Sequence, residues 1–399
     1  VATLINVQTA YAVQVTGATT MSDNARITYD GNTFNASVIC PQLSISGSVA
    51  NAVALHYCEA CLFSGGASVS LNNNVAIGTV GVAWNSNVPS HALQFSGKFV
   101  TGSYFTHQGL HLVVGDVYFN LYDQPAPVVF SNIINLKMRL IIYGPIGASV
   151  EIRQVSIVSL LLNGVTLNGP SQSLQLITVN VQENATVCHG SVTGASTVIS
   201  VSDGQYGGLL TFLNFVVANS ALITLKDNAV FDLGVAFVNV SVSDAALAIH
   251  AVSMRNTTRF VASTLTGCAC SFDHVSIDVV GPLGGPVVER VGISFTEGTI
   301  ISGGVLSFLT NDISVRQAAV GALFVPSYGL FLSADSAIVD AAHVRFEDNV
   351  IVAEAVDASS QGDELSPSRA IHFAGAFRRG AYFTHQGLHL VVGDVYFNL

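Results

Sequence analysis

A short alternating pattern recurs along the chain and constrains the fold more than any other feature. It consists of Ala, two further apolar residues at every second position, two residues of any type, an Asn, and another apolar residue after one more position. The copies begin at Ala25, Ala67, Ala221 and Ala342, and their asparagines are Asn32, Asn74, Asn228 and Asn349. Apolar residues at every second position predict a strand with one buried face. Asn tolerates the left-handed backbone conformation, so a turn is predicted to follow each strand.

Repeated strand–turn units without helical periodicity predict an all-β solenoid. The four asparagines are 42, 154 and 121 residues apart, and the first two spacings are multiples of 21–22. We therefore expect a right-handed parallel β-helix with irregular coils of about 20–24 residues. Only 10% of the residues are charged and 50% are hydrophobic, which suits stacked coils because like charges in a ladder repel. The alternative is a set of tandem β-sandwich domains joined near residues 281–286.

A longer duplication suggests how the chain is organised. Residues 104–121 recur without a change at 382–399. We expect a solenoid over 1–356, a polar loop at 357–368, and the truncated start of a second copy of coils 89–121 at 369–399. Both copies should adopt one coil geometry, with tight turns at Gly115 and Gly393. The chain then represents a fragment of a longer protein, with an uncapped last coil that favours self-association.

Charge and hydropathy exclude two classes of protein. The net charge is −11 with only three lysines, so no phosphate-neutralising surface is expected and nucleic acid is not a predicted partner. The mean hydropathy is +0.54, and residues 154–182 and 204–225 carry no charge. Asn and Gly interrupt both runs, so they predict buried strands and not membrane-spanning helices.

The six cysteines offer two possible sites. Cys58-x-x-Cys61 and Cys268-x-Cys270 have the residue types of a four-thiolate zinc site, but 207 residues of solenoid separate the pairs and no metal is expected. Cys40 lies about one coil before Cys58 and Cys61, so a disulfide from Cys40 to one of them is a candidate. Buried free thiols are the alternative. Cys268 and Cys270 lie two apart on a strand, face the same way, and are poorly placed to bond each other.

Catalytic motifs are absent from the sequence, and the remaining candidates are few. His107 and His111, repeated as His385 and His389, would lie about 13 Å apart on a strand, too far for one ion. Neighbouring Cys188 and His189 would point to opposite faces. Eight of the 25 acidic residues fall within 335–364. Among them, Glu347, Asp348 and Asn349 form a calcium candidate, although the spacing matches no EF-hand loop. We expect no cofactor.

Four Asn-x-Ser/Thr acceptors bear on location. They are Asn35, Asn184, Asn239 and Asn256. Acceptor sites of this kind are glycosylated on the surface of secreted proteins. The sequence therefore predicts an extracellular or cell-surface location, with any membrane anchor outside this chain.

The four copies of the Ala–Asn pattern, the Ser/Val-rich strands ISVSD (199–203) and VSVSD (240–244), and the acceptor sites resemble the large repetitive surface proteins of trypanosomes and related kinetoplastids. The dispersed gene family surface proteins are the most similar family. The resemblance implies a long extracellular β-helical ectodomain, a membrane anchor near its C-terminus and an adhesive role. Members of that family are richer in cysteine than this chain. Bacterial autotransporter passenger domains are the rival resemblance.

Two functions follow as expectations. The first is a non-enzymatic, adhesin-like surface rod that displays loops to host or cell-surface glycans or proteins. The second is a polysaccharide-acting β-helix enzyme, either a lyase or a glycoside hydrolase. The second requires two carboxylates that converge in one groove.

Overall fold

The computed structural model describes residues 2–5, 9–15, 18–40, 51–57, 61–65, 67–82, 87–89, 91–95, 98–99, 104–108, 113–114, 116–120, 128–134, 139–280, 290–318, 327–356, 368–386 and 390–397. Within these ranges every regular element is a β-strand. No helix in this part of the chain is long and apolar enough to cross a membrane. The chain divides into two compact units, Val1–Ser191 and Val192–Leu399.

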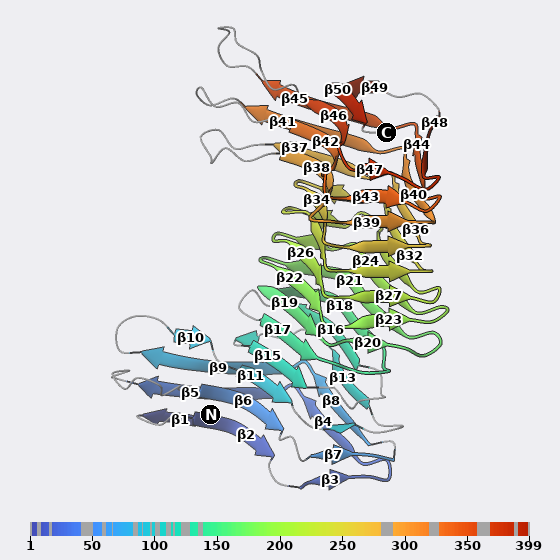
Figure 1. Cartoon of the computed structure of the whole chain (residues 1–399). Helices are drawn as coiled ribbons and strands as arrows, with labels where there is room; N and C mark the ends of the chain where they lie inside the picture. Colours follow the sequence, from blue (N-terminus) through green and yellow to red (C-terminus); the bar gives the residue numbers. More distant parts are fainter. Residues whose placement is uncertain are drawn as a thin grey trace. The chain divides into compact units, whose positions relative to one another are not determined.

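The unit Val192–Leu399 is built from coils that each add strands to the same three sheets (Figure 1). The first sheet contains β26 (Leu210–Leu213), β30 (Val235–Val238), β34 (Thr258–Val261), β38 (Arg290–Thr296), β42 (Ser327–Leu332), β46 (Arg369–Phe373) and β50 (Asp394–Phe397). The second contains β27 (Val216–Ala218), β31 (Ser241–Ser243), β35 (Thr264–Thr266), β39 (Ile300–Ser302), β43 (Ala337–Val339) and β47 (Ala376–Phe377).

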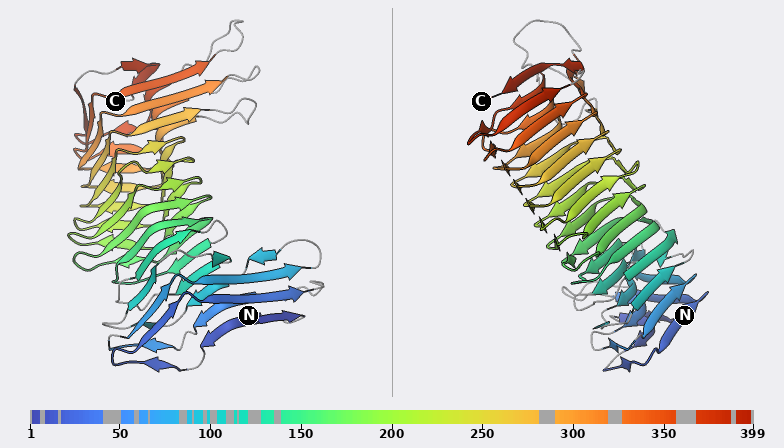
Figure 2. Two further views of the ribbon diagram at one scale, coloured as in Figure 1. Left: turned by 180° about the vertical axis from the view of Figure 1, so that it is seen from behind. Right: turned by 90° about the vertical axis from the view of Figure 1, so that its right-hand side faces the viewer.

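The third sheet of this unit consists of two successive runs of strands. One run is β24 (Val198–Ser202), β28 (Leu222–Lys226), β32 (Ala246–His250), β36 (Ala269–Asp273), β40 (Val305–Leu309), β44 (His343–Glu347) and β48 (Tyr382–Gln386). The other is β25 (Gln205–Tyr206), β29 (Val230–Phe231), β33 (Ser253–Met254), β37 (Ser276–Val280), β41 (Asp312–Ala318), β45 (Val350–Val356) and β49 (Leu390–Val392). Neighbouring strands are parallel, as between β32 and β36 or β38 and β42 (Figure 2). This arrangement confirms the predicted parallel β-helix and not tandem sandwiches.

The unit Val1–Ser191 follows the same plan. One parallel sheet contains β2 (Thr9–Val15), β6 (Asn51–Tyr57), β11 (His91–Phe95), β15 (Asp116–Asn120), β17 (Arg139–Tyr143), β19 (Ser159–Asn163) and β22 (Ala185–Cys188). A second contains β4 (Arg26–Asp30), β8 (Ser68–Asn72), β13 (Tyr104–Gln108), β16 (Val128–Ile134), β18 (Val150–Ile157) and β21 (Ser173–Val181).

Shorter sheets complete this unit. They contain β1 (Ala2–Ile5), β5 (Thr33–Cys40), β9 (Val75–Val82) and β14 (Val113–Val114), with β10 (Asn87–Pro89) antiparallel to β9, and β3 (Thr20–Met21), β7 (Leu62–Phe63) and β12 (Lys98–Phe99). The strand β20 (Thr166–Leu167) also belongs to it, and β23 (Ser191–Thr193) lies at the boundary between the units.

The core consists of like side chains stacked from coil to coil. Phe212, Phe237, Phe260 and Phe295 occupy one inward position of the first sheet of Val192–Leu399, with ring centroids 5.2, 4.7 and 4.8 Å apart and nearly parallel planes. A second stack joins Phe272 to Phe308 and Phe346, at 5.2 and 4.9 Å. Stacking of this kind follows from in-register parallel pairing, because each inward side chain meets its equivalent in the next coil.

Left-handed residues turn the chain at one corner of every coil. After β24, β28, β32, β36, β40 and β44, the backbone φ is positive at the residues Asp203 (52°), Asp227 (56°), Ala251 (50°), His274 (53°), Thr310 (52°) and Asp348 (52°). Asp and Asn tolerate this conformation best, which explains why the sequence places polar residues after its alternating strands. The corner therefore presents one column of side chains on the outside of successive coils.

The asparagines of the recurring pattern have two different roles. Asn349 is buried and, with Asn311 in the preceding coil, forms a ladder of carboxamides. The Oδ1 atom of Asn349 accepts hydrogen bonds from N–H (3.1 Å) and Nδ2 (2.8 Å) of Asn311, and its Nδ2 donates to the Phe308 carbonyl at 2.8 Å. Asn74 is buried in the same way, whereas Asn228 is exposed with φ of 63°.

Coil length corrects one expectation. Asn32 and Asn74, which are 42 residues apart, are hydrogen-bonded neighbours in successive coils, so the spacing is one coil and not two. Register partners of other successive coils are 20 (Arg139 and Ser159) to 41 (Leu330 and Ile371) residues apart. The predicted 20–24 residues describe the shorter coils only, because the longer ones contain an inserted segment.

The inserted segments lie in the chain between two strands: the long strand that follows the left-handed corner and the strand of the first sheet that comes after it. β37, β41 and β45 pack against β38, β42 and β46, and we call these six strands the extension. The two layers approach so closely at Gly292 that a Cβ atom there would lie 2.6 Å from the Gly329 carbonyl oxygen and from Cγ2 of Ile313. Glycine is therefore required at this point in the strand.

The segments 281–289, 319–326 and 357–367 join the strand pairs of the extension and lie outside the described residues. Two segments that the sequence predicts as loops connect these strands. Residues 281–286 lie in the chain between β37 and β38, and residues 357–368 lie between β45 and β46. β46 pairs with β42 and β48 with β44, so residues after 368 continue the existing sheets.

The described parts of the duplicated segment form equivalent strands in both places. Its first five residues form β13 and β48, and its later part forms β15 and β50. Both later strands show a register irregularity at their first Asp, Asp116 and Asp394. Gly393 has the left-handed φ of 110° that a tight turn requires, whereas Gly115 lies outside the described residues. The structure thus confirms the predicted common strand geometry.

Candidate functional site

The three residues of the calcium candidate, Glu347, Asp348 and Asn349, lie in different environments. Asn349 is 1% exposed, and its carboxamide is used in the buried ladder. Glu347 is half-buried and pairs with Arg345 on the same strand. Asp348 is exposed at the left-handed corner. These three residues are adjacent in sequence but point to different environments, because a strand end and a corner alternate their side-chain directions.

The cysteines serve as core residues in the described part of the chain. Cys61, Cys188, Cys268 and Cys270 are buried. Cys268 and Cys270 are free thiols whose Sγ atoms lie 2.9 Å apart, so they face the same way, as predicted, and interact by a hydrogen bond and not by a disulfide. The hydrogen bond to Cys268 and burial raise the pKa of the Cys270 thiol well above its usual value. Cys58 and the side chain of Cys40 lie outside the described residues, so a disulfide from Cys40 stays a prediction.

The remaining sequence candidates are Cys188 with His189 and the two duplicated histidine pairs. Cys188 is buried while neighbouring His189 is exposed, and burial raises the pKa of the Cys188 thiol. His385 is exposed on β48. His111, His389 and the side chain of His107 lie outside the described residues, so the spacing within each histidine pair stays a prediction.

The four glycosylation acceptors differ in exposure. Asn184 and Asn239 are exposed at turns, and Asn239 donates through Nδ2 to Oδ1 of Asn214 at 3.1 Å. Asn35 is half-buried on β5. Asn256 is half-buried, and its Oδ1 accepts the Thr257 backbone N–H at 2.8 Å. Glycosylation at Asn184 and Asn239 is therefore the most compatible with the fold.

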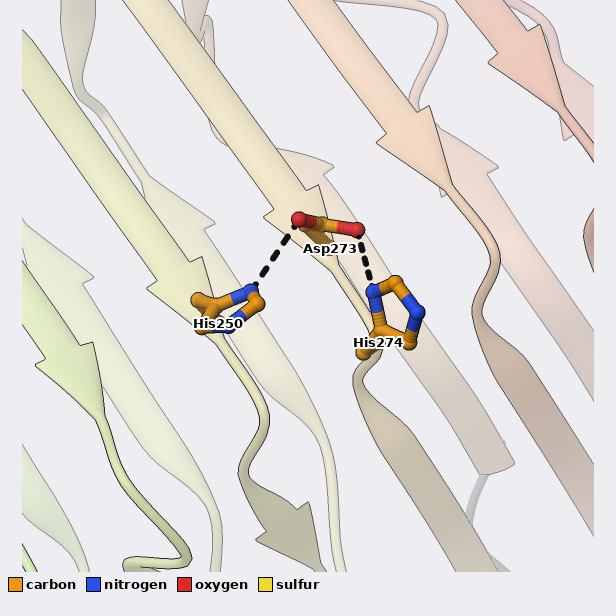
Figure 3. Close-up of side chains that lie close together, drawn as sticks. All are labelled: His250, Asp273 and His274. Carbon is orange, nitrogen blue, oxygen red and sulfur yellow. Dashed lines mark hydrogen bonds and ion pairs between the residues drawn. The ribbon is translucent and has the colours of Figure 1, made fainter.

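The sequence reading missed a cluster of His250, Asp273 and His274. The Asp273 carboxylate lies between the two imidazoles, with Oδ2 3.0 Å from Nδ1 of His250 and Oδ1 2.6 Å from Nδ1 of His274 (Figure 3). The two ring centroids are 5.8 Å apart. Within the described residues, these three are the group of His, Cys, Asp and Glu whose ligand atoms all lie within 4.8 Å of one another.

The coil geometry explains how this cluster forms. His250 ends β32 and Asp273 ends β36, and the two residues are direct neighbours in the parallel register. His274 follows at the left-handed corner with φ of 53°, which turns its side chain beside Asp273. The sequence contains one signal for this cluster, a polar residue directly after each alternating strand pattern. That signal predicts a cluster only when the register between neighbouring strands is known.

An aromatic stripe runs across β42, β46 and β50 of the first sheet of Val192–Leu399. Phe331, His372 and Tyr396 are paired neighbours in β42, β46 and β50, with centroids 5.5 and 5.0 Å apart and stacked rings. The guanidinium of Arg369 lies 5.3 Å from the centre of the Tyr396 ring. Burial and the charge of Arg369 lower the pKa of His372, so the neutral imidazole is favoured within the stack.

A small apolar cavity of about 170 Å³ lies inside the later coils of Val192–Leu399. Its lining includes Phe346, Ile351, Ile371, Phe383 and Phe397. The lining also includes Asn349 and one titratable residue, His385, so this cavity does not supply a pair of titratable groups for acid–base catalysis.

Comparison with known proteins adds no assignment. No family model, curated protein or solved structure matches this chain.

Proposed function

We propose that the chain belongs to a non-enzymatic, extracellular surface protein of adhesin-like type, in which a parallel β-helix displays loops to glycans or proteins on a cell surface. The proposal includes the resemblance to kinetoplastid surface proteins and an anchor outside this chain. The observation that carries it is the extension, because inserted segments lie between the ends of its neighbouring strands.

Rigid strands support these insertions. Val279, Val315 and Ala353 are buried between the layers, at 1%, 0% and 2% exposure. Long connections held on such a rigid scaffold are where binding residues concentrate in many proteins. The equivalent connection in a short coil is only Asp232–Leu233–Gly234, between β29 and β30. Coils with insertions therefore share the packed strands of the other coils and differ from them in the length of the connection that can carry binding residues.

A binding experiment with the whole chain tests the proposal. Segment 357–367 is replaced by a Gly/Ser sequence of equal length, which keeps the coil and removes the displayed side chains. Leu233→Ser, in the short connection of another coil, is the matched control, since Leu233 is 49% exposed. We expect binding on a glycan array or to cells to fall with the replacement and to persist with Leu233→Ser.

Two results would overturn the proposal. One is the absence of binding to any glycan or cell surface by the folded chain. The other is release of unsaturated or reducing ends from a polysaccharide, which would favour the alternative of a lyase or glycoside hydrolase. Mutation of the responsible carboxylates would then abolish that activity.

A further inference from the structure

We propose that His250, Asp273 and His274 form a surface site for a divalent transition metal ion of the zinc type. The proposal is independent of the adhesive function. It rests on two imidazoles and one carboxylate that converge from two successive coils.

The geometry requires little rearrangement. Both histidine Nδ1 atoms already face the carboxylate, at 3.0 and 2.6 Å from its two oxygens. Zinc binds nitrogen and oxygen ligands at about 2.0–2.2 Å, so ligand atoms around one ion lie about 3–3.5 Å apart. The cluster spans at most 4.8 Å between ligand atoms. Rotation of the exposed imidazoles about their side-chain torsions reduces the longest separation between ligand atoms from 4.8 Å to the distance that one zinc ion requires, without movement of the backbone.

The backbone that holds the ligands is fixed by the solenoid. His250 and Asp273 pair across β32 and β36, and the inward neighbours Ile249 and Phe272 are buried at 0% and 1% exposure. The backbone N–H of His274 donates to the Leu309 carbonyl of the next coil at 3.0 Å. Ligands from three positions are thus preorganised by main-chain hydrogen bonds, which lowers the cost of assembling the site.

The chemistry of the donors selects the ion. Imidazole and carboxylate together suit zinc, copper, nickel and cobalt, whereas calcium and magnesium require sets of oxygen ligands. The side chains of His250 and His274 are 50% and 59% exposed. Water therefore reaches the ion and completes its coordination, as in sites with three protein ligands.

Neighbouring charges leave the carboxylate available. Among the described residues, the ion pairs of Asp273 are with the two histidines. Its register partner in the following coil is the apolar Leu309. Lys226, at the end of the strand before β32, pairs with Asp227 at 2.9 Å. A bound dication would therefore meet one carboxylate and two neutral donors without a directly paired cation beside it.

The test is a zinc titration of the full chain after treatment with a chelator. Isothermal calorimetry at pH 7.5 measures zinc affinity, and Co²⁺ absorption in the visible range reports the coordination geometry. The variants are His250→Ala, Asp273→Asn and His274→Asn. Asn tolerates the left-handed φ of position 274. His189→Asn is the matched control, because His189 is also exposed and also has φ of 53°.

We expect one zinc-binding event that each of the three variants weakens by at least about tenfold and that His189→Asn leaves unchanged. Zinc should also raise the melting temperature of the parent chain more than that of the folded variants. The proposal is overturned if the chain binds no zinc, if all three variants bind as the parent does, or if calcium competes at equal concentration.

Discussion

Removal of the Asn311 side chain should be the most damaging polar substitution in the later coils. The Oδ1 atom of Asn311 accepts the Val275 backbone N–H at 2.9 Å, and Nδ2 donates to the Phe272 carbonyl at 3.0 Å. Asn311→Ala leaves both backbone groups buried without these partners. Each unsatisfied buried group costs about 1–3 kcal/mol, so we expect a loss of about 2–6 kcal/mol in the free energy of unfolding of these coils.

Hydrogen exchange measures this loss where it occurs. A solenoid can open one coil at a time, so a local probe is more direct than a global melting curve. A loss of about 2.8 kcal/mol corresponds to a hundredfold faster exchange when opening and reclosing are fast compared with the chemical exchange step. We expect an increase of that order for the amides of β37 and β41.

Asn228→Gly is the control for this experiment. Asn228 occupies the place in the recurring pattern that Asn349, the ladder partner of Asn311, occupies, but Asn228 is exposed, and glycine accepts its φ of 63°. We expect exchange in β37 and β41 to be unchanged. If Asn311→Ala accelerates exchange no more than Asn228→Gly does, the ladder does not stabilise the coils and the reasoning fails.

Three further predictions concern packing and pH. Gly329→Ala places a Cβ atom 2.4 Å from Cγ2 of Ile351, and we expect the free energy of unfolding in urea to fall by about 1–3 kcal/mol. An unchanged free energy of unfolding would mean that the two layers of the extension separate easily. Phe260→Ala interrupts a ring stack with centroid spacings of 4.7 and 4.8 Å, and we expect it to lower the free energy of unfolding by about 3–5 kcal/mol in the same assay. A smaller loss than that of Gly329→Ala would contradict this prediction. Burial and Arg369 lower the pKa of His372 below its ordinary 6.5, so the unfolded chain takes up the proton first and stability is lost as pH falls from 6.5 through the folded pKa. His372→Gln should reduce the difference in urea midpoint between pH 7.5 and pH 5, and an identical difference in both proteins would refute the assignment.

The fold could be predicted because its information is local and repeated. Alternation at Val344 and Phe346, followed by a turn residue and Asn349, describes one strand and one corner, and parallel stacking repeats them. The same rule places Cys268 and Cys270, since they occupy the small and apolar positions of an equivalent strand and are buried. A repeated sequence pattern that shows which residues face inward is thus sufficient to predict the fold class.

The coil lengths and the metal candidate could not be predicted in the same way. Asn32 and Asn74 are one coil apart because inserted residues do not alter the register of the strands that follow, and the spacing alone does not show this. His250 and Asp273 are 23 residues apart and become neighbours only through that register. Glu347, Asp348 and Asn349 are adjacent in sequence, and adjacency was a poor guide because consecutive side chains face different ways.

The extension also bears on how such a chain can change over generations. Its paired strands are held by Gly292, Gly329 and the buried residues between the layers, and none of these lies in the inserted segments. Doubling the length of a flexible connection costs only about 0.6 kcal/mol of closure entropy. Insertions, deletions and substitutions between the strand ends therefore leave the coils intact. The sequences between these strand ends are free to diversify under selection while the same scaffold is inherited, and foreign sequences can be grafted there without redesign of the core.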